Sequence, residues 1–131
     1  MSAPVGFVLF LVLTLGFLAG AVSSGLRAKR RVHLLCVAGA VACLAATIYH
    51  ALGVGKLYDL PAAGWITPVH LTMAKVATAS YLLPVVSGIR TIFHPPTCKL
   101  HRKIAFLVLS LTVATAITGT WMLLASPRIA G

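Results

Sequence analysis

Residues 31–50 read RVHLLCVAGAVACLAATIYH, and this stretch decides the fold. It contains a single charged side chain, that of Arg31, at its very start. A helix of about 20 mostly apolar residues is long enough to cross the hydrocarbon core of a bilayer. The stretch therefore predicts a transmembrane helix, and it carries a histidine near each end, His33 and His50.

The composition of the whole chain has the same character. Of its 131 residues, 60% are hydrophobic and 9% are charged, and the mean hydropathy is +1.01. An ordinary soluble domain carries roughly a quarter charged residues, and a disordered chain has low hydrophobicity, so both classes are excluded. Asp59 is the only acidic residue, which excludes catalysis by a pair of carboxylates. Three cysteines are too few for a disulfide framework.

Four stretches are long and apolar enough to span a membrane. They cover about residues 4–26, 32–54, 65–89 and 104–125. Because the connections are short, we expect an all-α, up-down four-helix bundle that forms a single transmembrane domain over residues 1–131. Pro84 predicts a kink in the third span. Gly16 and Gly20 predict a close helix contact in the first span, within the bundle or between protomers.

Basic residues are distributed unequally between the loops. Loops one and three carry Arg27, Lys29, Arg30, Arg31, Arg90, Lys99, Arg102 and Lys103. The opposite side has only Lys56 and Arg128. Since Lys and Arg are enriched in cytoplasmic loops, loops one and three are predicted to be cytoplasmic and both termini periplasmic. Tyr58, Trp65 and Trp121 are then expected as aromatic anchors of the outer interface. The net charge of +10, set between apolar runs, indicates membrane lipids rather than nucleic acid as the partner.

Histidines inside the spans are the main functional signal, since ionisable residues there are rare and usually functional. His50 lies near the outer end of the second span and His70 near the outer start of the third. Two imidazoles on neighbouring helices can take both axial positions of a haem iron. Together with Met73 they could instead bind copper. The other residues one turn away are small, which leaves room for a flat macrocycle but equally permits close helix packing.

A second candidate pair is formed by His33 and His101, at the cytoplasmic starts of the second and fourth spans. They could ligate an inner haem, or they could be interfacial histidines that contact lipid phosphate. His33 and His50 are separated by about 25 Å along an α-helix, at about 1.5 Å per residue. They cannot serve one haem, so they would belong to two haems in opposite leaflets.

Two other polar positions are weaker candidates. His94, with Cys98 and His101, could form a small metal site, but the spacing matches no strong zinc pattern and favours a loop histidine. Lys75 lies roughly 15 Å into the third span at about 1.5 Å per residue. A haem propionate or a carboxylate on a partner subunit could neutralise it. A lysine that extends to the interface, or that is uncharged, is an equal alternative.

A wider pattern of histidine, proline, glycine and basic positions gives a resemblance. It is carried by the runs Arg31–Leu35, Ile48–His50, His70–Ala74, Leu83–Val85 with Arg90, His101–Ala105 and Thr118–Leu123. In these runs the chain resembles the CtaM-like family of small four-helix bacterial membrane proteins, which is associated with the maturation of haem–copper oxidases. The resemblance implies a bacterial inner membrane and oxidase subunits as partners. It carries His33, His50, His70 and His101 over as the family's histidines.

The chain departs from that family in two places. The first span lacks the family's additional early histidine, and Trp121 stands near the position where a tyrosine often follows the Thr-Gly of the last helix. The expected architecture is also similar to that of two-haem transmembrane cytochromes b, including the ascorbate-reducible type.

Three functions fit this sequence. The first is a b-type haem protein with one or two haems that transfers electrons, alone or as a small subunit of a redox complex. Bis-histidine ligation leaves no open position on the iron, so we expect an electron carrier or accessory subunit rather than a stand-alone enzyme. The second, implied by the resemblance, is an oxidase assembly factor that handles copper or haem. The third is a structural membrane subunit without a cofactor. A second copy of the chain is a further candidate partner.

Overall fold

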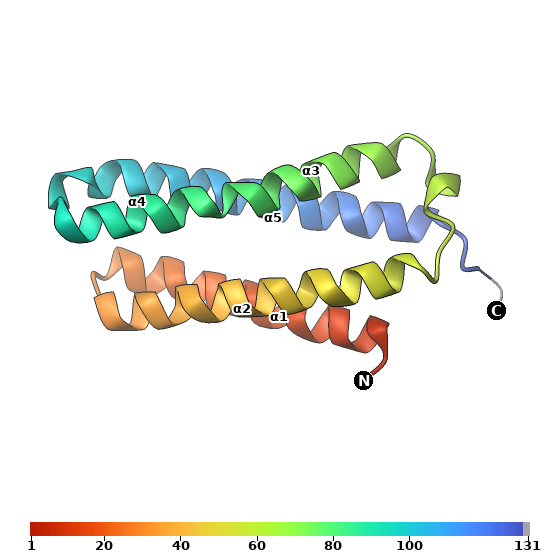
Figure 1. Cartoon of the computed structure of the whole chain (residues 1–131), viewed down its shortest axis with the longest axis horizontal. Helices are drawn as coiled ribbons and strands as arrows, with labels where there is room; N and C mark the ends of the chain where they lie inside the picture. Colours follow the sequence, from red (N-terminus) through yellow and green to blue (C-terminus); the bar gives the residue numbers. More distant parts are fainter. Residues whose placement is uncertain (130–131) are drawn as a thin grey trace. The chain divides into compact units, whose positions relative to one another are not determined.

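The computed structural model describes residues 1–129, whose regular elements are helices (Figure 1). The chain folds as two compact units, residues 1–58 and the residues from Asp59 on. It has four helical segments long and apolar enough to cross a membrane: Ala3–Leu26, Arg30–Gly55, Ile66–Phe93 and Pro95–Ala125. The predicted all-α chain with four helices long and apolar enough to span a membrane is therefore confirmed. The third span runs four residues further than predicted and the fourth starts earlier, because polar residues continue these helices beyond their apolar parts.

The first unit is an antiparallel pair of helices, α1 (Ala3–Leu26) and α2 (Arg30–Gly55). Pro4 lies in the first turn of α1, where a missing N–H costs nothing. The turn to α2 is closed at Ala28, whose φ of 55° lies in the left-handed region. The register is fixed at both ends, since Gly25 lies beside His33 and Gly53 beside Ala3.

Small and hydroxylic residues fill the contact between α1 and α2. The buried ones are Gly6, Thr14, Ala21 and Ser24 in α1, and Ala40 and Thr47 in α2. Near the middle, the hydroxyl oxygens of Thr14 and Thr47 lie 3.3 Å apart. Small residues allow helix backbones to approach closely in a membrane. Of the predicted glycine pair, Gly20 faces Cys36 across this contact, whereas Gly16 has no neighbour within 4 Å of the position its Cβ would take.

The second unit contains α3 (Ile66–Ser80), α4 (Leu82–Phe93) and α5 (Cys98–Ala125), with short 3₁₀ turns η1 (Leu60–Ala63) and η2 (Pro95–Thr97). The third span is broken at Tyr81, between α3 and α4. Pro84 explains the break, because it has no N–H to donate to the carbonyl of Ser80. The predicted kink is thus confirmed. The Tyr81 hydroxyl lies 2.9 Å from the Thr112 hydroxyl, which ties the broken span to α5.

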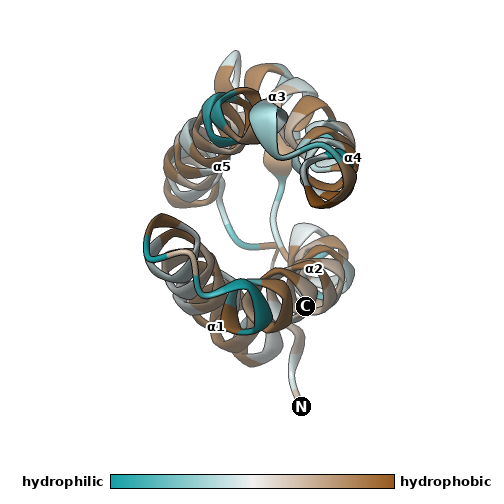
Figure 2. Ribbon diagram, turned by 90° about the vertical axis from the view of Figure 1, so that its left-hand side faces the viewer, coloured by the Kyte–Doolittle hydropathy of each residue, from teal (hydrophilic) through white to brown (hydrophobic). Residues whose placement is uncertain are grey.

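Large apolar side chains lie mainly on the outside of the helices. Leu35, Leu52 and Leu124 have exposed fractions of 73%, 68% and 84%. Figure 2 shows hydrophobic residues along the helices and hydrophilic ones at the turn between α1 and α2 and near the start of α5. So much exposed apolar surface is unusual for a soluble monomer. It fits a multi-pass membrane protein.

Candidate functional site

In the first unit, two histidines of α2 face glycines of α1. His33 is the fourth residue of α2 and lies over Gly25, where an added Cβ would be 3.1 Å from its Nδ1. His50 lies over Gly6, where an added Cβ would be only 2.5 Å from its Nδ1. Cβ contacts below 3.0 Å are essentially never found. Glycine at position 6 is therefore required for the observed place of the His50 ring.

The second unit repeats this arrangement. His70, the fifth residue of α3, lies over Gly119 of α5, where an added Cβ would be 2.7 Å from its Cε1. His101, the fourth residue of α5, lies over Gly88 of α4, where the same distance would be 3.2 Å. Each unit thus has one histidine with a tight glycine contact and one with a looser contact. All four imidazoles are half-buried.

The Nδ1 atom of His33 has a backbone partner. It lies 2.8 Å from the carbonyl oxygen of Ala21. A carbonyl can only accept a hydrogen bond, so Nδ1 carries the proton and donates it. The unshared electron pair of this imidazole is therefore on Nε2, the nitrogen that can ligate a metal.

The two histidines of the second unit have hydroxyl partners. Nδ1 of His70 lies 3.2 Å from Oγ1 of Thr118, and this hydroxyl donates its own proton to the carbonyl of Ala114 at 3.0 Å. Nδ1 of His101 lies 2.9 Å from Oγ of Ser87, whose proton is directed to a backbone carbonyl one turn earlier, at 3.3 Å. Each hydroxyl can accept from an Nδ1–H group while it donates its own proton to the carbonyl, so both contacts are compatible with the Nδ1–H tautomer.

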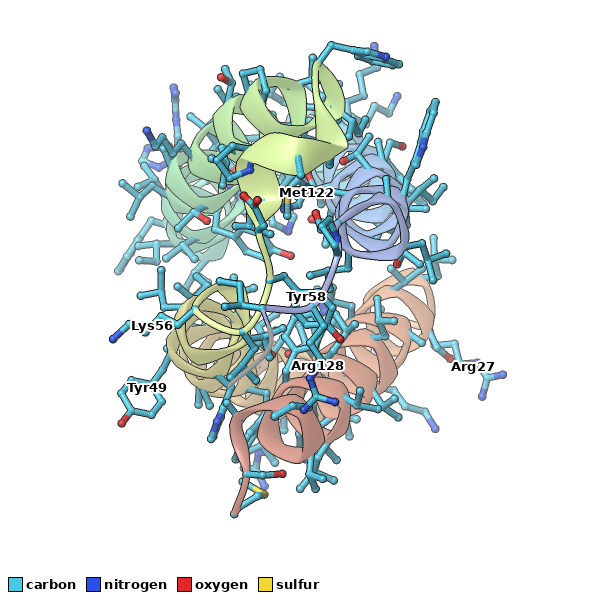
Figure 3. The ribbon with its side chains drawn as sticks, turned by 90° about the vertical axis from the view of Figure 1, so that its right-hand side faces the viewer. Arg27, Tyr49, Lys56, Tyr58, Met122 and Arg128 are labelled. Atoms are coloured by element: carbon cyan, nitrogen blue, oxygen red, sulfur yellow. The ribbon has the colours of Figure 1, made fainter. Side chains whose placement is uncertain are left out.

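His50 is held differently. Its ring stacks on that of Phe10, with centroids 5.6 Å apart and an angle of 13° between the planes. The ring of Tyr49 meets it edge-on at 5.3 Å. Tyr49 itself projects away from the first unit, as Figure 3 shows. Aromatic packing thus orients this ring.

The remaining predicted ligands are not gathered into a cluster. His94 is exposed at the end of α4, and Cys98 is exposed at the start of α5. Among residues 1–129, no group of three or more His, Cys, Asp or Glu side chains could hold a metal ion. The small metal site considered for His94, Cys98 and His101 is therefore not formed, and His94 is a loop histidine. Met73, the alternative copper ligand, is half-buried in α3.

The glycines and hydroxyls of the site were not singled out as site residues by the sequence. The missed residues are Gly6, Gly25, Gly88, Gly119, Ser87 and Thr118. One signal could have found them. In an antiparallel helix pair, the two residue numbers of each facing pair add up to nearly the same value. In the first unit, His50 with Gly6 and Cys36 with Gly20 add up to one value. In the second unit, His70 with Gly119 and His101 with Gly88 add up to another.

Comparison with known proteins gives no relative. The chain matches no family model, no curated protein and no solved structure. The resemblance to the CtaM-like family therefore stays a prediction, and the functional argument depends on the histidines and their surroundings.

Proposed function

We propose that this protein is a membrane-embedded b-type haem protein that transfers electrons, alone or as a small subunit of a redox complex. One observation carries the proposal: three of the four histidines place Nδ1 within hydrogen-bond distance of a partner on the facing helix. Histidines that ligate metals almost always make such a hydrogen bond, because it fixes the tautomer and turns Nε2 to the metal.

The position of each histidine supports two binding sites. His50 lies five residues before the end of α2, and His70 lies five residues into α3, after the connecting loop. If both helices span the membrane, the chain brings these two to the same level. His33 and His101 are each the fourth residue of a span that starts at the other level. We propose that His50 and His70 hold one haem, and that His33 and His101 hold a second.

The glycines support a flat cofactor in particular. Imidazoles that hold a haem would have to present Nε2 to its iron in a fixed orientation. A glycine behind each ring lets the imidazole lie against the backbone of the facing helix, so that the ring cannot tilt backward. When bound, haem supplies a reversible one-electron couple. The residues of the chain set its potential through ligand identity, hydrogen bonding and burial.

The proposed orientation gives this arrangement a direction. With loops one and three on the cytoplasmic side, the His33 and His101 site lies in the inner leaflet and the His50 and His70 site in the outer one. Electrons would then pass between two haems across the membrane. The basic residues of loops one and three would contact haem propionates or anionic lipid.

The test is the visible spectrum of detergent-purified protein, produced with an adequate supply of haem. We expect a Soret band that shifts on reduction with dithionite, together with sharp α and β bands. His70→Ala should reduce the haem content. His94 is exposed and lies outside the proposed sites, so His94→Ala should leave the haem content unchanged. A colourless wild-type protein, or equal haem content in both variants, would refute the proposal.

A further inference from the structure

Lys75 lies on a face of α3 that the second unit does not use. The inner face of α3 is marked by His70, which contacts α5, and by the buried Ala77. Lys75 is five residues after His70, about 140° further around a helix that turns about 100° per residue. Its side chain is exposed, in agreement with that angle. The lysine therefore points away from α5, toward whatever surrounds the unit.

The depth of Lys75 along α3 is also defined. Trp65 and Trp121 are exposed, and their rings meet edge-to-face at 5.3 Å, at the end of the unit where α3 begins. Tryptophans of this kind mark the boundary between hydrocarbon and headgroups. Lys75 is ten residues past Trp65, so it is about 15 Å deeper at about 1.5 Å per residue. A fully extended lysine side chain recovers only about 6 Å of that depth by snorkelling. Its ammonium group therefore stays within the hydrocarbon layer.

Residues 1–129 contain no acidic side chain that could meet this lysine. Its one acidic side chain is that of Asp59. The backbone N–H of Asp59 donates to the carbonyl of Pro127 at 2.9 Å, which places Asp59 beyond the end of α5. Residues 1–58 contain no acidic side chain at all. A second copy of the chain has the same composition, so it also lacks an acidic side chain at this depth.

We propose that the outward face of α3 around Lys75 binds a membrane-spanning helix of a different polypeptide, one that carries an aspartate or glutamate at the depth of Lys75. Cations within a membrane span are usually paired, because an isolated charge in hydrocarbon is costly. Thr72 and Ala79 lie one turn on either side of Lys75 on the same face, and both are exposed. Thr72 and Ala79 are small, which allows a close helix approach, and the exposed Leu71, also one turn from Lys75, adds an apolar contact. Phospholipid phosphates lie at the interface and are less suited to this depth.

Photo-crosslinking in membranes of the cells that naturally make the protein tests this pairing. A benzophenone side chain replaces Ala79, and a control chain carries it in place of Ile117, which is exposed on α5. We expect an adduct at position 79, to a membrane polypeptide with an acidic residue inside a span. Lys75→Gln should reduce the adduct at least fivefold, and Lys75→Arg should retain it. Changing the partner's acidic residue to its amide should give the same loss.

Several outcomes overturn the inference. One is the lack of any protein adduct at position 79, or an adduct only with lipid or with a second copy. Another is a partner without an acidic residue in its spans. A third is an adduct that Lys75→Gln leaves unchanged. The haem content of Lys75→Gln should equal that of the wild type, because Lys75 points away from His70. The proposal of a partner helix and the proposal of haem binding can therefore be refuted independently of each other.

Discussion

The two units hold their histidines on the same kind of surface but orient them by different means. In both, each imidazole rests on a glycine of the facing helix. In the first unit, one ring donates to a backbone carbonyl and the other stacks on Phe10. In the second, both rings contact hydroxyls, those of Thr118 and Ser87. The shared glycines indicate a common geometric requirement, and the different partners show that several side chains can meet it.

A second difference concerns the helices themselves. The α1–α2 pair is continuous, with small residues in its contact. The third span is interrupted at Tyr81, so that α3 meets α5 at Thr118 while α4 meets α5 at His101. The interruption allows two short helices to contact one long helix separately. The geometry of the second unit therefore depends on Pro84 and Tyr81, and the first unit has no counterpart of them.

The largest expected effect comes from filling the tight glycine contacts. Gly6→Ala and Gly119→Ala each place a methyl group within 2.7 Å of the facing imidazole, so the ring must move. If His50 and His70 hold one haem, as proposed, each variant should lose it, which is half of the total. The measurement is haem per protein by the pyridine haemochrome method.

Matched glycine variants serve as controls for that result. Gly16→Ala meets no atom within 4 Å, and it should leave the haem content unchanged. Gly25→Ala and Gly88→Ala approach their imidazoles at 3.1 and 3.2 Å, and they should weaken haem binding without abolishing it. A uniform effect of all these substitutions would mean that the glycines serve helix packing rather than the histidines.

The next effect concerns the hydroxyl partners of the histidines in the second unit. Thr118→Val keeps the shape of the side chain but removes the acceptor for Nδ1–H of His70. Loss of such a partner typically reduces metal affinity by about 10- to 100-fold. We expect faster loss of one haem to a haem-accepting protein. Thr120→Val, at an exposed threonine on the same helix, is the control. Equal rates for the two variants would contradict the assignment of Thr118.

A smaller effect is expected for the aromatic contact in the first unit. Phe10→Leu removes the stacked ring beside His50 but keeps an apolar side chain there. Aromatic pairs contribute about 0.5–1.5 kcal/mol beyond burial. We expect a modest rise in haem release from the site of His50, less than that caused by Thr118→Val. A larger effect of Phe10→Leu than of Thr118→Val would mean that the aromatic contact of the first unit contributes more to haem retention than the hydroxyl contact of the second.

The smallest effect should come from the hydrogen bond at the helix break. Tyr81→Phe removes the hydroxyl that lies 2.9 Å from that of Thr112. Hydrogen bonds between membrane helices contribute about 0.6 kcal/mol on average. The free energy of unfolding in mild detergent should fall by about that amount, with haem content unchanged. A loss of haem would show that the break at Tyr81 positions the histidines.

The predictable part of this fold follows from two features of the sequence, the apolar runs and the proline at position 84. The four spans follow from the apolar runs, and the break at Tyr81 follows from Pro84. The apolar run predicts that the last span starts at about residue 104, whereas α5 begins at Cys98. The difference arises because the basic residues near His101 belong to the helix and not to the loop. Charged residues end an apolar run, but they do not end a helix that continues into the interface.

The histidines were predictable as candidates, but their surroundings were not. A histidine in an apolar span is visible in any sequence, as at His50 and His70. The glycine and hydroxyl that face it belong to another helix, and they are identified only when the register is known. That register depends on where the turn lies, here at Ala28 in the first unit. Thr47, one turn from His50, faces Thr14 inside the first unit, and this contact too depends on the register.

The central claim is that each haem takes one histidine from each unit, and a stoichiometry series tests it most directly. Haem per protein is measured for the wild type, His50→Ala, His70→Ala and the double variant. The proposal predicts two haems in the wild type and one in each of the other three, since both substitutions remove the same haem. A double variant with less haem than either single variant would show that His50 and His70 bind separately. A wild-type protein without haem would contradict the function itself.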